Sequence, residues 1–310
     1  MFTVLWVVLV LVVAGLATAA CFFRFDRDPA PLEAEYATPP SRFVTAGGIR
    51  FHIRDRGEGP VLVLLHGQSA NFVAWEDAAA LLAKEHRVIS VDMPGHGLTG
   101  TDPAERYSPA DLARSLDALV TALGLTRFAL AGNSLGGGVA EEYALAHPEK
   151  LSVLLLLDPL GAPVLGPRPS AFAAQTIPVI GPLVRWFAPP WIVRPILATT
   201  YADPRRLTAP VARAFALLLL RAGNRAAQYK TLLGAVHTTL PARIAGITTP
   251  TLLIWGSRDS WISPRHAAYM VAQIPGIELK MLDGLGHQPM LEDPAATVAA
   301  MAPFLAAHGP

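Results

Sequence analysis

The amino-acid sequence predicts an α/β domain with a mostly parallel sheet, an inserted helical segment and a membrane-spanning helix at the N-terminus. Beyond residue 42, short apolar runs typical of buried strands alternate with helix signals. This alternation stops between residues 161 and 245, and residues 2–23 carry no charged side chain. We therefore divide the chain into an anchor, a linker, a core in two parts and an inserted cap, at residues 1–24, 25–41, 42–160 with 246–310, and 161–245.

Length, charge and cysteine content narrow the possible classes of function. The 310 residues suffice for one large α/β domain or two small ones. The formal net charge of +1 gives no electrostatic reason to expect a nucleic-acid partner. The single cysteine, Cys21, excludes an internal disulfide and a cysteine-based metal site. We expect no cofactor and no metal.

The charge-free run at residues 2–23 favours a membrane anchor over two alternatives. A helix of this length reaches about 33 Å, enough to cross a hydrocarbon core. A cleaved signal peptide would need a positive n-region, and only the terminal amine precedes the run, although Ala17-Thr18-Ala19 resembles a cleavage site. A lipoprotein would carry its lipid on Cys21, but Thr18 stands where a leucine is usual. A single uncleaved span fits best.

The residues after the apolar run bear on orientation and on the link to the next domain. Arg24 and Arg27 lie on the C-terminal side of the run, which favours a cytoplasmic location for the rest of the chain. We therefore expect a single-pass membrane protein. Residues 25–41 are rich in charge and proline and have no apolar period, which predicts a tether.

The strand and helix signals predict a sheet covered by helices on both faces. Residues 50–54 alternate polar and apolar, as a half-buried antiparallel edge strand does. Ser108, Pro109 and Asp111 form a helix start, and two more helices are predicted from residue 263 and over 294–307. Continuous apolar runs typical of buried strands lie at residues 61–65, 88–91, 128–131, 153–157, 251–255 and 277–282.

Residues 161–245 contain apolar helical segments broken by prolines and small residues, which predicts a helical lid over a pocket. Trp186, Phe187 and Trp191 form an aromatic cluster in this region. We favour packing within the lid for this cluster, and a surface that dips into the membrane is the alternative. Together with Tyr229, these residues are candidates for the pocket lining.

The segment Gly132-Asn133-Ser134-Leu135-Gly136 lies between a strand-like run and a helix-like run. A G-x-S-x-G motif in this context is typical of a nucleophile elbow, which exposes the serine above the sheet. Gly132 and Gly136 permit the tight turn and the close approach of helix and strand. Ser134 is therefore the candidate nucleophile.

A serine nucleophile needs a base, and the base needs an acid that fixes its tautomer. His287 is the candidate base and Asp259 the candidate acid, because both follow predicted strands in the chain order serine, acid, histidine. Asp158 also follows a buried strand and is the rival acid. Asp259 is preferred because its loop lies near the histidine loop in chain order. Asp283 is too close in sequence to His287 to orient it without strain.

Stabilising the negative charge of an acyl-transfer intermediate requires main-chain N–H groups that point at the developing oxyanion. We expect one donor from Leu135, directly after the nucleophile, and the other from Gln68 in the loop after the strand at 61–65. Gly67 permits close approach of that loop. We interpret His66 as a structural residue that holds the loop.

Residues 42–308 resemble the α/β-hydrolase superfamily, in the capped branch that includes carboxylesterases, C–C bond hydrolases, perhydrolases, epoxide hydrolases and haloalkane dehalogenases. The matching segments are His66-Gly67, Asp92-Met93-Pro94-Gly95-His96-Gly97, Gly132 to Gly136, Gly256-Ser257-Arg258-Asp259, and Gly286-His287-Gln288-Pro289 with Glu292 and Pro294. The resemblance implies an eight-stranded, mostly parallel sheet flanked by helices. It also implies that the Asp92–Gly97 segment is a structural turn. Epoxide hydrolases and dehalogenases carry aspartate where this chain has Ser134, which argues against both.

The resemblance implies acyl transfer. Ser134 attacks a carbonyl carbon, an acyl-enzyme forms, and water activated by His287 releases the acid. The first hypothesis is a serine hydrolase acting on a small or medium hydrophobic ester. The alternatives are a C–C bond (β-diketone) hydrolase, a perhydrolase or acyltransferase, and a non-catalytic ligand-binding homologue.

Overall fold

An eight-stranded sheet forms the centre of the computed structural model, which describes residues 2–163, 176–177, 181–182, 186 and 189–309. The strand order is β1-β2-β4-β3-β5-β6-β7-β8. β1 and β2 pair antiparallel, as do β2 and β4, and the remaining pairs are parallel. The strands are β1 (Ser41–Ala46), β2 (Ile49–Arg56), β3 (Val61–Leu65), β4 (Arg87–Val91), β5 (Phe128–Asn133), β6 (Leu151–Leu157), β7 (Thr251–Gly256) and β8 (Glu278–Leu282).

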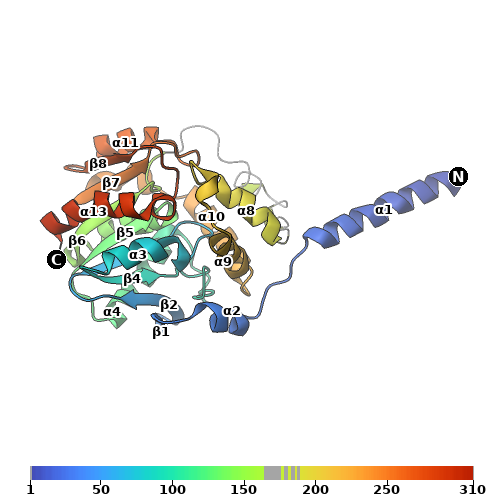
Figure 1. Ribbon diagram of the computed structural model, residues 1–310, viewed down its shortest axis with the longest axis horizontal. Helices are drawn as coiled ribbons and strands as arrows, with labels where there is room; N and C mark the ends of the chain where they lie inside the picture. The colour runs from blue at the N-terminus through green and yellow to red at the C-terminus, as the bar shows by residue number, and fades with distance from the viewer. Residues whose placement is uncertain (1, 164–175, 178–180, 183–185, 187–188, 310) are drawn as a thin grey trace.

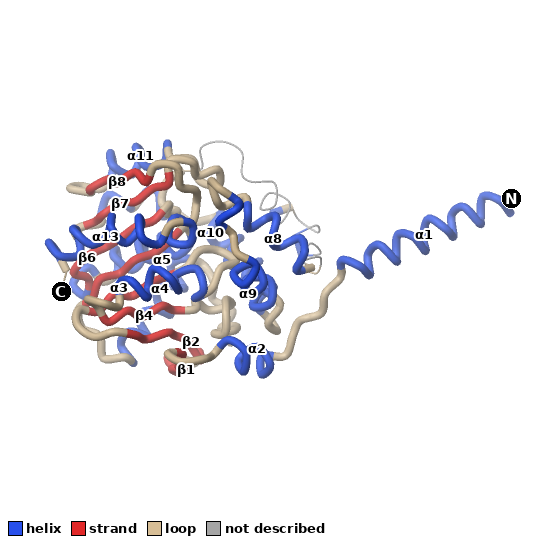
Figure 2. Tube along the Cα trace, in the orientation of Figure 1, coloured by secondary structure: helices blue, strands red, loops and turns tan. Residues whose placement is uncertain are grey.

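Helices cover both faces of this sheet, as Figure 2 shows. The α-helices are α1 (Phe2–Phe22), α2 (Pro29–Tyr36), α3 (Glu76–Leu82), α4 (Pro109–Ala122), α5 (Leu135–Ala146), α8 (Pro190–Ala198), α9 (Ala209–Leu219), α10 (Asn224–Val236), α11 (Arg265–Gln273), α12 (Pro289–Glu292) and α13 (Pro294–His308). Short 3-10 turns are η1 (Phe72–Trp75), η2 (Pro148–Lys150), η3 (Pro204–Arg206), η4 (Leu240–Ala242) and η5 (Ile244–Gly246).

Alternate side chains of the central strands face the two layers of helices. Leu62 and Leu64 of β3 pack in the core layer that contains α3, α12 and α13. Val63 and Leu65 pack in the layer that contains α4, α5 and α11. All four side chains are buried, and each contributes about 1.5–3 kcal/mol relative to exposure. A strand with two buried faces explains why the run is continuously apolar.

The predicted buried strands correspond to β3 through β8, and the predicted helix start at Ser108 is confirmed. The Ser108 hydroxyl accepts from the Asp111 amide, and the Asp111 carboxylate accepts from the Ser108 amide. Two details differ from the prediction. Residues 50–54 lie in β2, which is antiparallel but is not an edge strand, because β1 flanks it. β8 is the opposite edge, so only Leu282 among its residues is buried.

The N-terminal helix α1 projects away from the rest of the molecule (Figure 1). The side chains from Val4 to Val13 are apolar and between 50% and 66% exposed. Within the described part of the chain, no helix is both long and apolar enough to cross a membrane. The membrane-spanning helix predicted for residues 1–24 is therefore not supported, since the side chains described from Val4 to Gly15 fall short of the about 20 apolar residues that a span requires.

The predicted tether is not a free linker. It contains α2, which the Asp28 side chain caps by accepting from the Ala30 amide. Leu32 of α2 is buried, and Glu33 pairs with Arg50 of β2 at 2.7 Å. The charges that suggested a solvated segment instead pair with cations of the folded domain.

Between β6 and β7 the chain leaves the sheet in a segment that we call the insertion (residues 161–245). Its described residues form helices α8, α9 and α10, which lie on the side of the molecule that faces α1 (Figure 1). Trp186 stacks on Phe23 with ring centroids 5.6 Å apart, and Trp191 is 56% exposed. The aromatic cluster predicted to pack inside the lid is thus not one internal cluster, and Phe187 lies outside the described residues.

Candidate active site

Ser134 occupies the turn between β5 and α5. Its φ of 53° and ψ of −116° lie in a region that residues with side chains rarely adopt. The Ser134 amide donates to the Leu157 carbonyl at 3.0 Å, which fixes the turn against β6. A Cβ at Gly132 would overlap the main-chain oxygen of Gly136, and one at Gly136 would lie 2.5 Å from the His66 oxygen. Both glycines are therefore required by the close approach of strand, helix and neighbouring loop.

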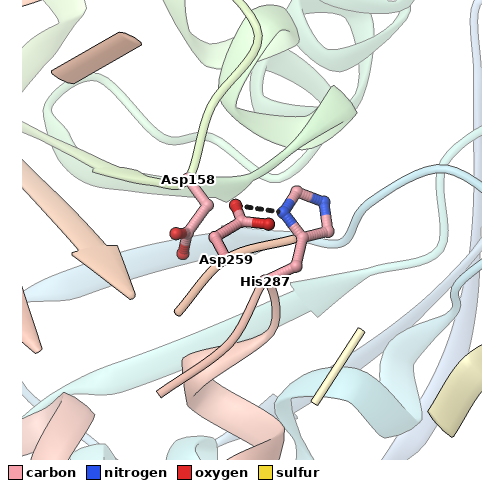
Figure 3. Close-up of side chains that lie close together, drawn as sticks. All are labelled: Asp158, Asp259 and His287. Atoms are coloured by element: carbon pink, nitrogen blue, oxygen red, sulfur yellow. Dashed lines mark hydrogen bonds and ion pairs between the residues drawn. The ribbon is translucent and has the colours of Figure 1, made fainter. Parts of the chain in front are cut away.

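His287 and Asp259 form a buried hydrogen-bonded pair at the ends of β8 and β7 (Figure 3). His287 Nδ1 lies 2.8 Å from Asp259 Oδ2. The other carboxylate oxygen, Oδ1, accepts from the amides of Trp261 at 2.7 Å and Ile262 at 3.0 Å. The Trp261 ring stacks on His287 at 5.8 Å. With Nδ1 held in this way, Nε2 is the ring nitrogen that can exchange a proton with a hydroxyl group.

Asn133 connects the serine turn to the histidine loop. Its side-chain amide donates to the main-chain carbonyls of His287 at 3.0 Å and Leu157 at 3.1 Å. Ser134 itself is partly exposed. Among the described residues no hydrogen bond joins the Ser134 hydroxyl to His287, and such contacts are often long before substrate binds.

Asp158 lies beside this pair, at the end of β6 (Figure 3). Oxygen or nitrogen atoms of Asp158, Asp259 and His287 lie within 4.8 Å of one another. The hydrogen bond to His287 Nδ1 comes from Asp259 and not from Asp158. Burial, reinforced by the charge of Asp259, raises the pKa of Asp158 well above its usual value.

This acidic cluster fits proton transfer better than metal binding. A metal ligand must be deprotonated, and the raised pKa of Asp158 keeps that carboxyl group protonated. The remaining two groups already bind each other through Asp259 Oδ2 and His287 Nδ1. The donor set therefore does not match a metal site.

The loop after β3 lies against the serine turn, as the sequence predicts. A Cβ added to Gly67 would lie 3.2 Å from the Cβ of Ser134. Among the described residues, the main-chain amides of Gln68 and Leu135 donate to no other main-chain carbonyl. Both remain candidate donors to an oxyanion. The Gln68 side chain donates to the Gln228 carbonyl of α10 at 2.9 Å, which links this loop to the insertion.

His66 ties the same loop to the turn after β4. The Met93 amide donates to His66 Nε2 at 3.1 Å, so Nδ1 carries the proton and donates to the Gly67 carbonyl at 2.8 Å. Burial lowers the pKa of His66 and keeps the ring neutral. Asp92 accepts from the Phe72 and Leu98 amides, which organises the predicted structural turn.

Two residues of the insertion that the sequence did not single out contact both loops of the pair. The Thr200 carbonyl accepts from the His287 amide at 2.7 Å, and its hydroxyl accepts from the Gln288 side chain at 2.9 Å. The Thr199 carbonyl accepts from the Ser260 hydroxyl at 3.0 Å, and its hydroxyl accepts from the Trp261 indole at 2.9 Å. Main-chain acceptors leave no mark on a sequence, so no pattern could have identified them.

Glu292 supports the same region from the other side. Its carboxylate accepts from the amides of Gly286 at 2.8 Å, Ala202 at 3.0 Å and Asp203 at 2.8 Å. It therefore joins the histidine loop to the insertion. The sequence marked Glu292 only as part of a motif, because its partners are main-chain groups.

Residues 62–300 match the model of the alpha/beta hydrolase family. The chain belongs to this family. Two relatives have named activities. One is monoacylglycerol lipase abhd6-B of Xenopus laevis, which is 28% identical over 85% of this chain and 81% of its own length. The other is 2-hydroxy-6-oxononadienedioate/2-hydroxy-6-oxononatrienedioate hydrolase of Comamonas testosteroni, which is 27% identical over 80% of this chain and 90% of its own length.

A solved structure of a membrane phospholipase A, described as a bacterial virulence factor, is similar to this α/β hydrolase along nearly the whole chain. The TM-score is 0.77 at 26% identity, and the match covers 99% of this chain and 98% of the other. The match therefore includes the insertion as well as the sheet.

Proposed function

We propose that this α/β hydrolase is a serine hydrolase that cleaves carboxylic esters through Ser134, His287 and Asp259. The 2.8 Å hydrogen bond between His287 Nδ1 and Asp259 Oδ2, beside the strained turn of Ser134, carries the proposal. It supplies a base of fixed tautomer next to an exposed hydroxyl group.

The reaction follows from this arrangement. His287 Nε2 takes the hydroxyl proton as Ser134 Oγ attacks the ester carbonyl carbon, and Asp259 stabilises the resulting imidazolium. The amides of Leu135 and Gln68 stabilise the oxyanion of the tetrahedral intermediate. The imidazolium protonates the leaving alcohol as the C–O bond breaks. A water molecule then attacks the acyl-enzyme, with its proton taken by His287, and the acid is released.

A hydrophobic ester is the substrate class that we favour. The similarity to a monoacylglycerol lipase and to a membrane phospholipase A supports a lipid ester. We propose that residues 161–245 are a helical cap whose described helices α8, α9 and α10 border the acyl pocket. The similarity to a C–C bond hydrolase favours β-diketone acids as the second candidate substrate class.

Activity assays on the full chain test the enzyme class. Wild type should hydrolyse p-nitrophenyl esters and react with a fluorophosphonate probe. Ser134→Ala should do neither. A wild-type protein as inactive as Ser134→Ala across ester chain lengths, and unlabelled by the probe, would favour the non-catalytic alternative. Faster turnover of a β-diketone acid than of any ester would favour the C–C hydrolase.

We further propose that α1 associates with a lipid bilayer. Ten consecutive apolar side chains, Val4 to Val13, are exposed, and apolar surface of this extent is unfavourable in water. Wild type should co-sediment with phosphatidylcholine vesicles, and a Val8→Asp, Leu9→Asp double variant should not. Equal sedimentation of both proteins would contradict the proposal. Protease accessibility in intact cells tests the single-pass arrangement with a cytoplasmic hydrolase domain.

A further inference from the structure

Asp158 and Asp259 are adjacent carboxyl groups with unequal surroundings. Asp158 is fully buried and adopts a φ of 44° at the end of β6. Its Oδ1 accepts from the Gly256 amide at 2.8 Å, and its Oδ2 is buried with no hydrogen-bond partner among the described residues. One donor for two oxygens is a poor environment for a carboxylate in a low-dielectric interior.

Asp259 has the opposite environment. Its Oδ1 accepts from the amides of Trp261 and Ile262, and its Oδ2 faces His287 Nδ1. Three donors favour the ionised form of a carboxyl group. Two buried carboxylates at this separation cannot both ionise, because their mutual repulsion is not screened by water. The proton of the pair therefore belongs on the residue with fewer donors, which is Asp158.

We propose that Asp158 is protonated and donates its Oδ2–H to the carboxylate of Asp259, as a positioning residue for the acid of the triad. This role rests on the proposed serine hydrolase function. The hydrogen bond holds the Asp259 carboxylate in the plane that serves His287. It also withdraws electron density from that carboxylate and so limits how strongly Asp259 retains the imidazolium proton. No proton leaves Asp158 during turnover.

The titration behaviour of the cluster agrees with this arrangement. Burial, the charge of Asp259 and the hydrogen bond with Asp259 all raise the pKa of Asp158, whereas the Gly256 amide lowers it. The titratable groups that face Asp158 are Asp259 from the loop after β7 and His287 from the loop after β8 (Figure 3). Each keeps its role as Asp158 stays neutral.

Two substitutions of Asp158 in the full chain separate the hydrogen-bond donor from the charge. Asp158→Asn keeps a donor towards Asp259 and an acceptor for Gly256, so kcat/KM should stay within about threefold of wild type. Asp158→Leu removes the donor. Its kcat/KM should fall about 10- to 100-fold, the size expected for one hydrogen bond to a charged group.

The pH profile distinguishes positioning from simple loss of structure. In Asp158→Leu, Asp259 retains its full electron density and stabilises the imidazolium more strongly, so the acidic limb of kcat/KM should move to higher pH. The limb of Asp158→Asn should coincide with that of wild type. An unshifted limb in a folded Asp158→Leu protein would overturn the proposal. A loss in Asp158→Asn as large as in Asp158→Leu would also overturn it, because Asp158 would then act as a carboxylate.

Infrared spectroscopy tests the proton without any activity. The carbonyl stretching band of a protonated carboxyl group should be present in wild type and absent in Asp158→Asn. Glu141 is the matched control, because it is fully buried, both its oxygens lack partners among the described residues, and burial raises its pKa well above the usual value. Glu141→Gln should remove a separate band. A spectrum unchanged by Asp158→Asn overturns the protonation, whereas an inactive wild type with the expected band overturns only the hydrolase function.

Discussion

The main-chain amide of His287 donates a hydrogen bond of 2.7 Å to the main-chain carbonyl of Thr200. The histidine belongs to the loop after β8, and the threonine belongs to the insertion between β6 and β7. The position of the candidate base is therefore fixed in part by the segment that we propose as the cap. A displacement of the insertion at Thr200 would also displace His287.

Removing the Thr200 hydroxyl should lower turnover. In Thr200→Val, the Gln288 side chain loses its acceptor while the main-chain bond to His287 remains. We expect kcat to fall about 3- to 10-fold with little change in KM, which corresponds to one neutral hydrogen bond. Thr231→Val is the matched control, since Thr231 is also buried and its hydroxyl bonds only within α10, to Ala227. Equal losses of kcat in both variants would contradict a specific role of Thr200.

Replacing the Glu292 carboxylate should weaken the junction between the insertion and the core. In Glu292→Gln one oxygen becomes an amide, so at least one of the amides of Gly286, Ala202 and Asp203 loses its acceptor. An unpaired buried donor costs about 1–3 kcal/mol, which urea unfolding measures. Glu149→Gln, on the exposed η2 turn, should leave the unfolding midpoint unchanged. A Glu292→Gln midpoint equal to that of wild type would mean that water replaces the carboxylate.

A methyl group at Gly132 should be far more costly than one at a permissive glycine. Alanine at Gly132 overlaps the Gly136 carbonyl, so β5 and α5 must separate and the Ser134 turn must change. We expect a loss of at least about 3 kcal/mol in stability, together with loss of esterase activity. Gly124 has positive φ but open space around it, so Gly124→Ala should cost only about 1–2 kcal/mol and keep activity. Similar losses in the two variants would show that backbone strain, rather than overlap, dominates.

The buried carboxyl group of Glu141 should make stability fall as pH rises. Burial and the charge of Glu142 raise its pKa in the folded protein, so the folded state holds a proton that the unfolded state releases. Between the unfolded and folded pKa values, this group lowers the free energy of unfolding by about 1.4 kcal/mol per pH unit. Glu141→Gln cannot ionise. Its stability relative to wild type should therefore increase from pH 5 to pH 8, as measured by urea unfolding, and a constant difference would contradict the argument.

Residues that act through their own side chains at strand ends could be predicted from the sequence. Short apolar runs predicted β3 through β8 because those strands are buried between two layers of helices. The chain order of Ser134, Asp259 and His287 predicted a common edge, and the structure brings Asp259 and His287 into hydrogen-bond contact there. Their catalytic roles remain proposals.

Features that depend on long-range pairing could not be predicted. β1 was missed because it is a partly exposed edge strand with little apolar signal. The contacts of Thr200 use a main-chain carbonyl, which every residue has. The charges of the segment 25–41 suggested solvent exposure, and only the fold supplies their partners, such as Arg50 for Glu33.

The chain that follows α1 is held by the insertion rather than by the sheet. The Arg225 side chain binds Asp26 at 2.9 Å and the Arg24 carbonyl at 2.8 Å, and the Arg27 amide donates to the Leu220 carbonyl at 2.6 Å. A shortened protein that began after α2 would therefore lose bracing of α10 along with its apolar helix. For expression of a trimmed enzyme, the cut belongs before residue 23, where the hydrophobic segment ends and the bracing has not yet begun.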